Sequence, residues 1–332
     1  MKRILIIGTG SIGERHLRCF QNTRRAEVAA CEPNEELGRS VAGRYGCPWY
    51  GSLDEALGAA SFDAAVICTP AQTHIAIATQ CVRRGLHLLI EKPLAVTLEG
   101  IPELQALVGE RNAIVRVAYI HRSLAPVRKV KDLLESGVIG EPKQLVIVTG
   151  QHFPTFRPAY RSIYYTRHES GGGAIQDALT HSLHGAEWLL GPIQSVFADA
   201  AHQVLEGVEV EDTVHLLARF GGAGNGVLGS FSLNQFQPPN EAYLTLNGTE
   251  GSLRSESHRF RVGVQRYGDE DWNWHQLPPE DRDGPFLRQA EAFLNALDGC
   301  PEDLATLGDG LQTLRVNIAA LESSRTRREI DL

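Results

Sequence analysis

A short apolar strand that runs directly into a glycine-rich turn and a helix is the feature that most limits the fold of this chain. Arg3–Ile7 is an almost entirely apolar run, which is typical of a strand buried on both faces of a parallel sheet. Gly8, Gly10 and Gly13 follow with G-x-G-x-x-G spacing, and a helix is predicted from about Glu14 to Thr23. This order of strand, turn and helix is typical of the start of a doubly wound α/β sheet.

The alternation of short apolar strands and helices continues to about residue 120. Strands are predicted at 28–31, 64–68, 87–90 and 114–118, and helices at 35–45, 52–60, 75–84 and 98–111. Strict alternation indicates βαβ units, whose strands run parallel. We therefore predict an α/β architecture in which residues 1–120 form a Rossmann domain, a doubly wound parallel sheet that binds a dinucleotide.

The pattern changes after residue 120. Strands are predicted at 143–150, 195–202, 212–220, 227–235, 242–247, 251–256 and 259–266, and helices at 126–136, 174–190, 285–297 and 309–324. Consecutive strands with few helices between them indicate antiparallel pairing. We predict that residues 121–332 form an α+β domain with a mostly antiparallel, open sheet, and that this domain binds the substrate and mediates oligomerisation.

Composition excludes several classes of function. The 332 residues carry a net charge of -8, which argues against a nucleic-acid partner or a polybasic membrane surface. The six cysteines form no C-x-x-C pair, so we expect neither a disulfide framework nor a metal site. The apolar start breaks into glycines after Ile7, unlike a signal peptide, and no run of about 18 apolar residues is present. We expect a cytoplasmic protein with no membrane partner.

The glycine-rich turn predicts a dinucleotide site. The first glycine permits the tight turn, the second lets the backbone approach a pyrophosphate, and the third lets helix and strand pack closely. Ser11 and Ile12 complete the turn at the helix N-terminus, which faces the phosphates. Glu32 ends the second strand, where a carboxylate can accept hydrogen bonds from a ribose and favours NAD. Arg39 could pair with a phosphate, so NADP is not excluded.

Two further polar segments stand at strand ends, where open α/β sheets bind their ligands. Glu91-Lys92-Pro93 ends one strand, and Thr69-Pro70 ends another, with His74 shortly after. A lysine beside a nicotinamide can hydrogen-bond a substrate hydroxyl and favour its alkoxide form. The alternative for Lys92 is an exposed loop lysine.

Asp177 and His181 form the third candidate group. They lie four residues apart on a predicted helix that follows Gly171-Gly172-Gly173, so they share one helix face. Histidine can act as a general base near neutral pH, and a carboxylate one turn away can orient it or hold a substrate hydroxyl. A satisfied polar pair on an amphipathic helix is the alternative. His184 is expected beside this site.

Together these motifs resemble those of the Gfo/Idh/MocA oxidoreductases, which include glucose–fructose oxidoreductase and inositol dehydrogenase. The shared motifs are G-x-G-x-x-G-x-x-H from Gly8 to His16, Thr69-Pro70 with His74, Glu91-Lys92-Pro93, Gly171-Gly172-Gly173 with Asp177 and His181, Glu211-Asp212-Thr213, and Gly248 to Leu253. The resemblance implies an enzyme that uses NAD(P) to oxidise or reduce one carbon of a sugar, cyclitol or related polyol. It implies catalytic roles for Lys92, Asp177 and His181, and cofactor contacts from Thr69, Pro70, His74, Glu91 and Lys92.

The substrate is expected to be a small carbohydrate-like molecule. The segment 152–170 is rich in aromatic and arginine side chains, which suit a sugar and, through the arginines, an acidic group on it. The substrate-binding residues predicted are Lys92, Tyr119, Arg167, His168, Asp177 and His181. The loop arginines could instead pair with neighbouring acids. Ile120 and His121 stand where the family often has asparagine, so no role is assigned to them.

The resemblance also bears on the oligomeric state, and it leaves open two functions other than that of a dehydrogenase. One face of the C-terminal sheet is expected to meet another subunit, which gives a homodimer or homotetramer. A non-catalytic NAD(P)-binding sensor is one alternative function. The other is a glycosidase in which bound NAD is reduced and re-oxidised within each cycle.

Overall fold

The computed structural model of the chain describes residues 1–222 and 226–332. Contacts divide the chain into two compact units: Met1–Ile120 with Asp281–Leu311, and His121–Glu280 with Gln312–Leu332. The predicted fold class is confirmed, because one unit carries a parallel Rossmann sheet and the other a mostly antiparallel sheet. Residues 281–311 pack with the first unit, although they follow the second sheet in the sequence.

The first unit is built on a seven-stranded sheet. Its strands are β1 (Lys2–Ile7), β2 (Ala26–Cys31), β3 (Trp49–Tyr50), β4 (Ala64–Ile67), β5 (His87–Ile90), β6 (Val115–Val117) and β15 (Ala305–Thr306). The order is β15-β6-β5-β4-β1-β2-β3, and the pairs are parallel apart from β15 with β6. The chain order reverses between β1 and β4, which is the point where doubly wound sheets bind ligands.

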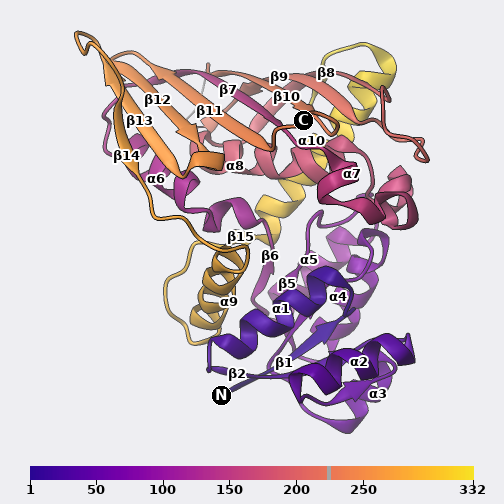
Figure 1. The fold of residues 1–332 in the computed structure, drawn as a ribbon. Helices are drawn as coiled ribbons and strands as arrows, with labels where there is room; N and C mark the ends of the chain where they lie inside the picture. Colours follow the sequence, from indigo (N-terminus) through magenta and orange to yellow (C-terminus); the bar gives the residue numbers. More distant parts are fainter. Residues whose placement is uncertain (223–225) are drawn as a thin grey trace. The chain divides into compact units, whose positions relative to one another are not determined.

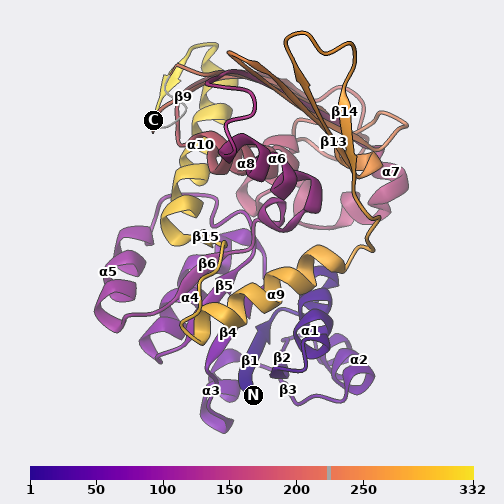
Figure 2. The same cartoon turned by 90° about the vertical axis from the view of Figure 1, so that its left-hand side faces the viewer.

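Helices cover this sheet, and one of them comes from late in the sequence. They are α1 (Ser11–Asn22), α2 (Glu35–Tyr45), α3 (Leu53–Ala59), α4 (His74–Arg83), α5 (Ile101–Arg111) and α9 (Gly284–Leu297), with a short 3₁₀ turn η1 (Ala71–Thr73). Figure 2 shows α9 lying alongside α1. Phe20 and Phe293 meet edge to face with ring centroids 6.2 Å apart, and Arg18 donates two hydrogen bonds to Asp283 at 2.6 and 2.9 Å. These contacts explain why residues 281–311 belong to the first unit.

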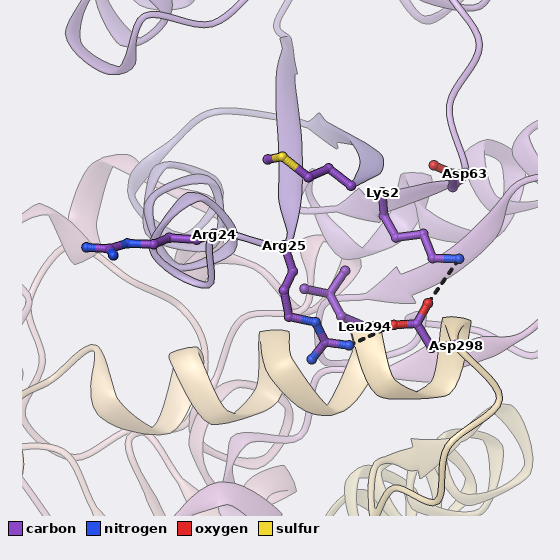
Figure 3. A pocket seen from close by; sticks show the side chains of 7 residues that line it. Lys2, Arg24, Arg25, Asp63, Leu294 and Asp298 are labelled. Atoms are coloured by element: carbon purple, nitrogen blue, oxygen red, sulfur yellow. Dashed lines mark hydrogen bonds and ion pairs between the residues drawn. The ribbon is translucent and has the colours of Figure 1, made fainter.

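The amino ends of the parallel strands carry a charged pocket of about 540 Å³ (Figure 3). Asp298 lies between two cations, since its carboxylate is 3.2 Å from Lys2 Nζ and 2.8 Å from Arg25 Nη2. These charged side chains pair with one another at the amino ends of the strands, whereas the glycine-rich turn follows the carboxyl end of β1. The pocket therefore does not belong to the predicted cofactor site.

The second unit is built on a nine-stranded sheet (Figure 1). Its strands are β7 (Pro142–Gly150), β8 (Ile193–Ala201), β9 (Thr213–Phe220), β10 (Leu228–Asn234), β11 (Glu241–Gly248), β12 (Gly251–Glu256), β13 (Arg261–Arg266), β14 (Asn273–Gln276) and β16 (Ile330–Asp331). The order is β14-β13-β12-β11-β7-β10-β9-β8-β16. Among the described strands, β7 and β10 pair in parallel and the other neighbours are antiparallel.

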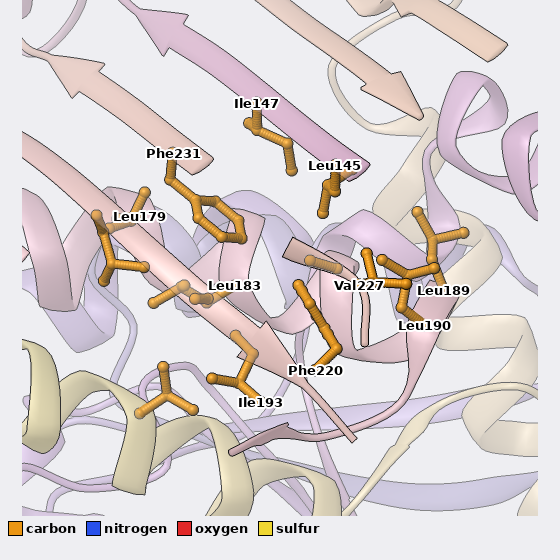
Figure 4. Close-up of a cluster of buried hydrophobic side chains, with 14 of the residues drawn as sticks. Leu145, Ile147, Leu179, Leu183, Leu189, Leu190, Ile193, Phe220, Val227 and Phe231 are labelled. Atoms are coloured by element: carbon orange, nitrogen blue, oxygen red, sulfur yellow. The ribbon is translucent and has the colours of Figure 1, made fainter. Parts of the chain in front are cut away.

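Helices cover one face of the second sheet (Figure 1). The long ones are α6 (Ala125–Glu135), α8 (Thr180–Leu190) and α10 (Leu307–Thr326), the last of which begins in the first unit. Shorter turns are η2 (Ile120–Ser123), α7 (Phe153–Phe156), η3 (Pro158–Ser162), η4 (Tyr164–Thr166), η5 (His168–Ser170), the π-helical η6 (Ala174–Leu179) and η8 (Ser257–Arg259). Figure 4 shows Leu183 and Leu190 of α8 among sheet residues such as Ile147 and Phe231. Burial of this apolar face is the main stabilising contribution to the unit.

The other face of the second sheet exposes large apolar side chains. Val148, Phe197, Leu217 and Leu228 are 43%, 40%, 58% and 50% exposed, respectively. Register places Leu217 opposite both Phe197 and Ser230, so these side chains share one face of the sheet. A groove of about 330 Å³ runs over this face.

Among the helices of the described residues, none combines the length and the apolar character that a bilayer-spanning segment requires.

Candidate active site

The glycine-rich turn joins β1 to α1 in a conformation that its glycines make possible. Gly8 has φ +83°, a left-handed value that side chains other than glycine rarely adopt. A Cβ on Gly13 would lie 1.9 Å from the carbonyl oxygen of Gly8, so the helix could not approach the strand with any larger residue there. The first and third glycines are therefore required by the fold of the turn itself.

Gly10 and the start of α1 leave room for a ligand. Within the described residues, no atom lies within 4 Å of a Cβ built on Gly10, and no side chain caps the N-terminus of α1. The first N–H groups of a helix carry partial positive charge and bind phosphate well. This turn fits a pyrophosphate, as the sequence predicts, with Ser11 and Ile12 in the first turn of α1.

Glu32 is buried directly behind the turn. Its carboxylate accepts hydrogen bonds from Thr9 N at 2.8 Å, from Thr9 Oγ1 at 3.3 Å and from Asn34 N at 3.1 Å. The side chain thus fixes the backbone between Gly8 and Gly10, in addition to the ribose contact predicted for it. Arg39 is the residue that could pair with the additional phosphate of NADP. In the structure it pairs with Glu35 at 2.8 Å and lies over the Trp49 ring.

The loop after β5 is held by a buried pair that reaches α1. Glu91 Oε1 accepts a hydrogen bond from His16 Nε2 at 2.7 Å, and Glu91 Oε2 accepts one from the backbone N–H of Lys92 at 3.0 Å. His16 is fully buried and Glu91 is 6% exposed. The Lys92–Pro93 peptide bond is cis. The backbone of Lys92 is therefore anchored by Glu91, and Glu91 is anchored by His16 of helix α1.

His74 connects the loops that follow β4 and β5. Its Nδ1 lies 3.1 Å from Pro93 O and its Nε2 lies 2.8 Å from Thr69 O. Burial lowers the pKa of His74, although both carbonyl contacts act in the opposite direction. A neutral imidazole donates through only one nitrogen, so the two carbonyls compete for one proton. Thr69 and His74 thus shape the strand ends around Lys92, with Pro70 between them in sequence.

In the second unit, the helix that carries Asp177 and His181 begins differently from the prediction. The sequence predicts one α-helix over 174–190, whereas the structure has the π-helical η6 followed by α8. Glu211 forms two hydrogen bonds with the first turn of η6. Its Oε1 accepts a hydrogen bond from Ile175 N at 2.8 Å, and its backbone O accepts one from Ala174 N at 2.9 Å. A Cβ on Gly173 would lie 2.6 Å from the Glu211 carboxylate, which explains the glycine there.

Asp177 and His181 each contact a side chain from outside the helix. Tyr164 donates its hydroxyl hydrogen to Asp177 Oδ1 at 2.7 Å, and Asp177 is 6% exposed. The ring of His121 stacks on that of His181, with centroids 5.1 Å apart and planes at 24°. π-Helical segments are frequent at functional sites, and this one carries a buried carboxylate one turn before an imidazole. Such a pair can hold a hydroxyl group and accept its proton.

The three remaining predicted substrate residues lie in different environments. Tyr119 is buried directly after β6 in the first unit. Arg167 is exposed in the second unit. His168 pairs with Glu211, with Nε2 and Oε2 2.5 Å apart, and this hydrogen bond raises the pKa of His168. His168 and Glu211 also line a pocket of about 720 Å³ within the second unit.

Much of the aromatic loop forms a small core of its own. Phe153, Tyr160 and Tyr165 are buried with Leu205, Val208 and Val210. Arg161 lies over the Tyr160 ring and pairs with Glu206 at 3.3 Å. These side chains support the loop, so the aromatic richness of the segment is largely structural.

Three residues beside the candidate pair were not predicted as site residues: Tyr164, His121 and Glu211. From the sequence, Tyr164 is one of several loop aromatics that suit a sugar, His121 has no assigned role, and Glu211 belongs to a shared motif. No local pattern distinguishes them, because each meets Asp177, His181 or the start of η6 through a contact distant in the sequence.

Comparison with known proteins identifies the protein family to which the chain belongs. Residues 2–119 match the family described as an oxidoreductase family with an NAD-binding Rossmann fold, and residues 127–254 match the Gfo/Idh/MocA C-terminal domain. The chain therefore belongs to the Gfo/Idh/MocA family, and residues 2–119 form an NAD-binding Rossmann domain. The resemblance noted from the motifs and the prediction of NAD as cofactor are both confirmed.

Individual relatives are distant in sequence but align over nearly the whole chain. The sequence is 26% identical over 314 residues to 1,5-anhydro-D-fructose reductase of Ensifer adhaerens, covering 94% of this chain and 90% of that one. It is 23% identical over 339 residues to inositol 2-dehydrogenase of Rhizobium meliloti (strain 1021), covering 99% of each. The WlbA dehydrogenase from Bordetella pertussis, solved with NADH and UDP-GlcNAcA, has a TM-score of 0.85 at 25% identity, covering 100% of this chain and 97% of that one.

Proposed function

We propose that this protein is an NAD-dependent oxidoreductase that transfers a hydride between the nicotinamide and a hydroxyl-bearing carbon of a sugar, cyclitol or sugar derivative. The observation that carries the proposal is the buried Asp177 one helical turn before His181, in a chain whose other unit presents Lys92 at the cofactor edge of a Rossmann sheet. The names of the Ensifer and Rhizobium relatives, a fructose-derivative reductase and an inositol dehydrogenase, support this substrate class.

The first unit holds the cofactor in this proposal. The glycine turn and the start of α1 bind the pyrophosphate, and Glu32 remains near enough to the turn to accept a ribose hydroxyl. Thr69, Pro70, His74 and Glu91 shape the neighbouring strand ends. When bound, NAD supplies the hydride acceptor or donor.

The proton chemistry falls to three side chains. In the oxidising direction, His181 accepts the proton of the substrate hydroxyl through a ring nitrogen. The Lys92 ammonium stabilises the negative charge that develops on the substrate oxygen. Asp177, fixed by the Tyr164 hydroxyl, orients the substrate or His181. In the reducing direction the protonated His181 returns the proton.

Substrate recognition and assembly extend the proposal. Tyr119, Arg167 and His168 contact the substrate, and the exposed guanidinium of Arg167 favours one that carries an acidic group. The apolar open face of the second sheet joins copies of the chain into a homodimer or homotetramer, since exposed apolar patches of this kind mark interfaces.

A panel of sugars, cyclitols and their acids, offered with NAD and with NADP in parallel, tests the proposal. A dehydrogenase accumulates one NADH for each molecule of substrate oxidised. Binding of NAD with no reaction on any compound would instead indicate a sensor. Glycoside cleavage without net NADH would indicate a cofactor that is recycled within each turnover.

A further inference from the structure

The dipeptide His121-Arg122 in η2 holds helix α8 on two adjacent faces. The His121 ring stacks on His181, with centroids 5.1 Å apart and ring planes 24° from parallel. Stacking of this kind is favourable for aromatic pairs and restricts the rotation of both rings. His121 therefore contacts the proposed proton acceptor.

The surface of α8 is shaped to receive the His121 ring. Gly185 lies one turn after His181, and a Cβ built there would be 3.4 Å from His121 Nδ1 and 3.7 Å from His121 Cβ. A longer side chain at position 185 would therefore occupy the space of the ring. His181 and Gly185 together form the surface of α8 that contacts His121, since residues four apart lie on one helix face.

Arg122 fixes the dipeptide to the neighbouring face of α8. Its Nε donates to His184 Nε2 at 2.9 Å, and its guanidinium lies 5.7 Å from the centroid of the Trp188 ring. His184 Nδ1 in turn donates to Thr313 Oγ1 at 3.1 Å, and Thr313 donates to Glu187 at 2.7 Å. Arg122 is 8% exposed and His184 is 1% exposed, so this is a buried, directional anchor. The position of His121 is therefore set independently of His181.

We propose that His121 is a positioning residue that holds the imidazole of His181 in the orientation needed for proton transfer. The proposal rests on the proposed role of His181 as the proton acceptor. The stacked ring covers one face of the half-buried His181 imidazole, so its removal takes away one restriction on the rotamers of that side chain. A proton acceptor that spends most of its time misaligned lowers kcat and leaves cofactor binding unchanged.

Two substitutions separate ring stacking from simple bulk. His121→Phe keeps an aromatic ring and His121→Leu removes it at similar size. We expect His121→Leu to lower kcat about tenfold, with the Kd for NAD and the KM for substrate changed less than about twofold. We expect His121→Phe to retain wild-type kcat. Equal activity of all three proteins, or equal loss in both variants, would overturn the proposal.

A second variant and a spectroscopic measurement keep the test independent of activity. Gly185→Leu displaces the ring from the helix side, so it should reproduce the loss in His121→Leu and add nothing to it in the double variant. In the NMR spectrum of the histidine rings, the His181 signal, assigned with His181→Asn, should carry a ring-current shift in wild type and His121→Phe. That shift should be absent in His121→Leu, and its persistence there would contradict stacking as the cause.

His181→Asn separates failure of this proposal from failure of the proposed function. If His181→Asn turns over like wild type, the role of His181 as proton acceptor is wrong. If His181→Asn is inactive while His121→Leu is fully active, His181 keeps its role and the inference about His121 is wrong.

Discussion

The glycine-rich turn of the first unit and the Asp177–His181 helix of the second are built by different means. The turn is held by constraints close together in the sequence, such as the contact of Gly13 with Gly8 O across five residues. The helix is arranged by distant side chains: Glu211 at its start, Tyr164 on Asp177 and His121 on His181. The first region is specified by backbone shape and the second by side-chain contacts between separate segments.

The difference teaches which substitutions each region tolerates. A backbone turn fails when a single methyl group is added where no space exists. A site assembled from side chains loses function stepwise, because each contact contributes a separate part of the geometry. The predictions below test this distinction, from the largest expected effect to the smallest.

The largest effect is expected at the turn. Gly13→Ala places a Cβ 1.9 Å from Gly8 O, so strand and helix must separate and the pyrophosphate seat is lost. We expect NAD affinity to fall at least about 100-fold and stability to fall by about 3 kcal/mol, at the upper end for overpacking. Calorimetric titration with NAD and thermal unfolding measure the two effects.

Gly10→Ala is the matched control. Its φ is -61° and a Cβ there meets no atom of the described residues within 4 Å, so the fold should keep its stability. NAD affinity should still fall, because the methyl group occupies the space in which the backbone approaches the cofactor. Unchanged NAD affinity in Gly10→Ala would contradict the placement of the pyrophosphate.

The next effect is expected at the buried His16–Glu91 pair. His16→Ala removes the donor 2.7 Å from Glu91 Oε1 and leaves that buried carboxylate with one fewer partner. We expect a loss of about 3 kcal/mol in the free energy of unfolding, as is typical when one partner of a buried pair is removed. We also expect a lower kcat, because Glu91 anchors the backbone of Lys92. Chemical denaturation and steady-state kinetics test this, and a fully stable variant would show that the pair contributes little.

A smaller effect is expected at Asp177. Tyr164→Phe removes the hydroxyl that donates to Asp177 Oδ1 but keeps the ring. Losing one hydrogen bond of about 1–1.5 kcal/mol should lower kcat/KM by roughly 5- to 13-fold. NAD affinity should not change, since Tyr164 and the glycine-rich turn proposed to bind NAD belong to different units. Wild-type kcat/KM in Tyr164→Phe would remove Tyr164 from the site.

The smallest effect concerns stability and pH at the half-exposed His168. The hydrogen bond to Glu211 raises the pKa of His168 above its usual value near 6.5. The protonated pair therefore stabilises the folded state fully below that value, and the contribution is lost as pH rises through the raised pKa. The Tm difference between wild type and His168→Gln should be larger at pH 5.5 than at pH 8.5. A difference that grows with pH would contradict this pairing.

The two regions also differ in how far the sequence predicts them. Apolar runs such as Ile4–Ile7 and the glycine spacing after them are local signals, so the Rossmann sheet and its cofactor turn follow from the sequence. The antiparallel sheet follows from the succession of strands. The packing of 281–311 with the first unit does not, because contacts such as Arg18 with Asp283 join residues 265 positions apart.

In the candidate site, too, local patterns are predictable from the sequence and contacts between distant segments are not. The shared face of Asp177 and His181 is predictable because four-residue spacing places them on one face in either an α- or a π-helix, but the same spacing does not show which helix forms. The sequence predicts a ribose contact for Glu32, and its bonds to Thr9 make it part of the turn as well. The contacts of Tyr164 with Asp177 and of His121 with His181 are not predictable from the sequence, because they depend on which segments the fold brings together.

Turnover and NAD affinity measured side by side in Lys92→Ala and His181→Asn test the central claim, that cofactor binding and proton chemistry depend on different side chains. The account predicts that both variants bind NAD within about threefold of wild type, while kcat falls at least about 100-fold, as expected for loss of a charge-stabilising or proton-transferring group. Loss of NAD binding in parallel with turnover, or wild-type turnover in either variant, would contradict it.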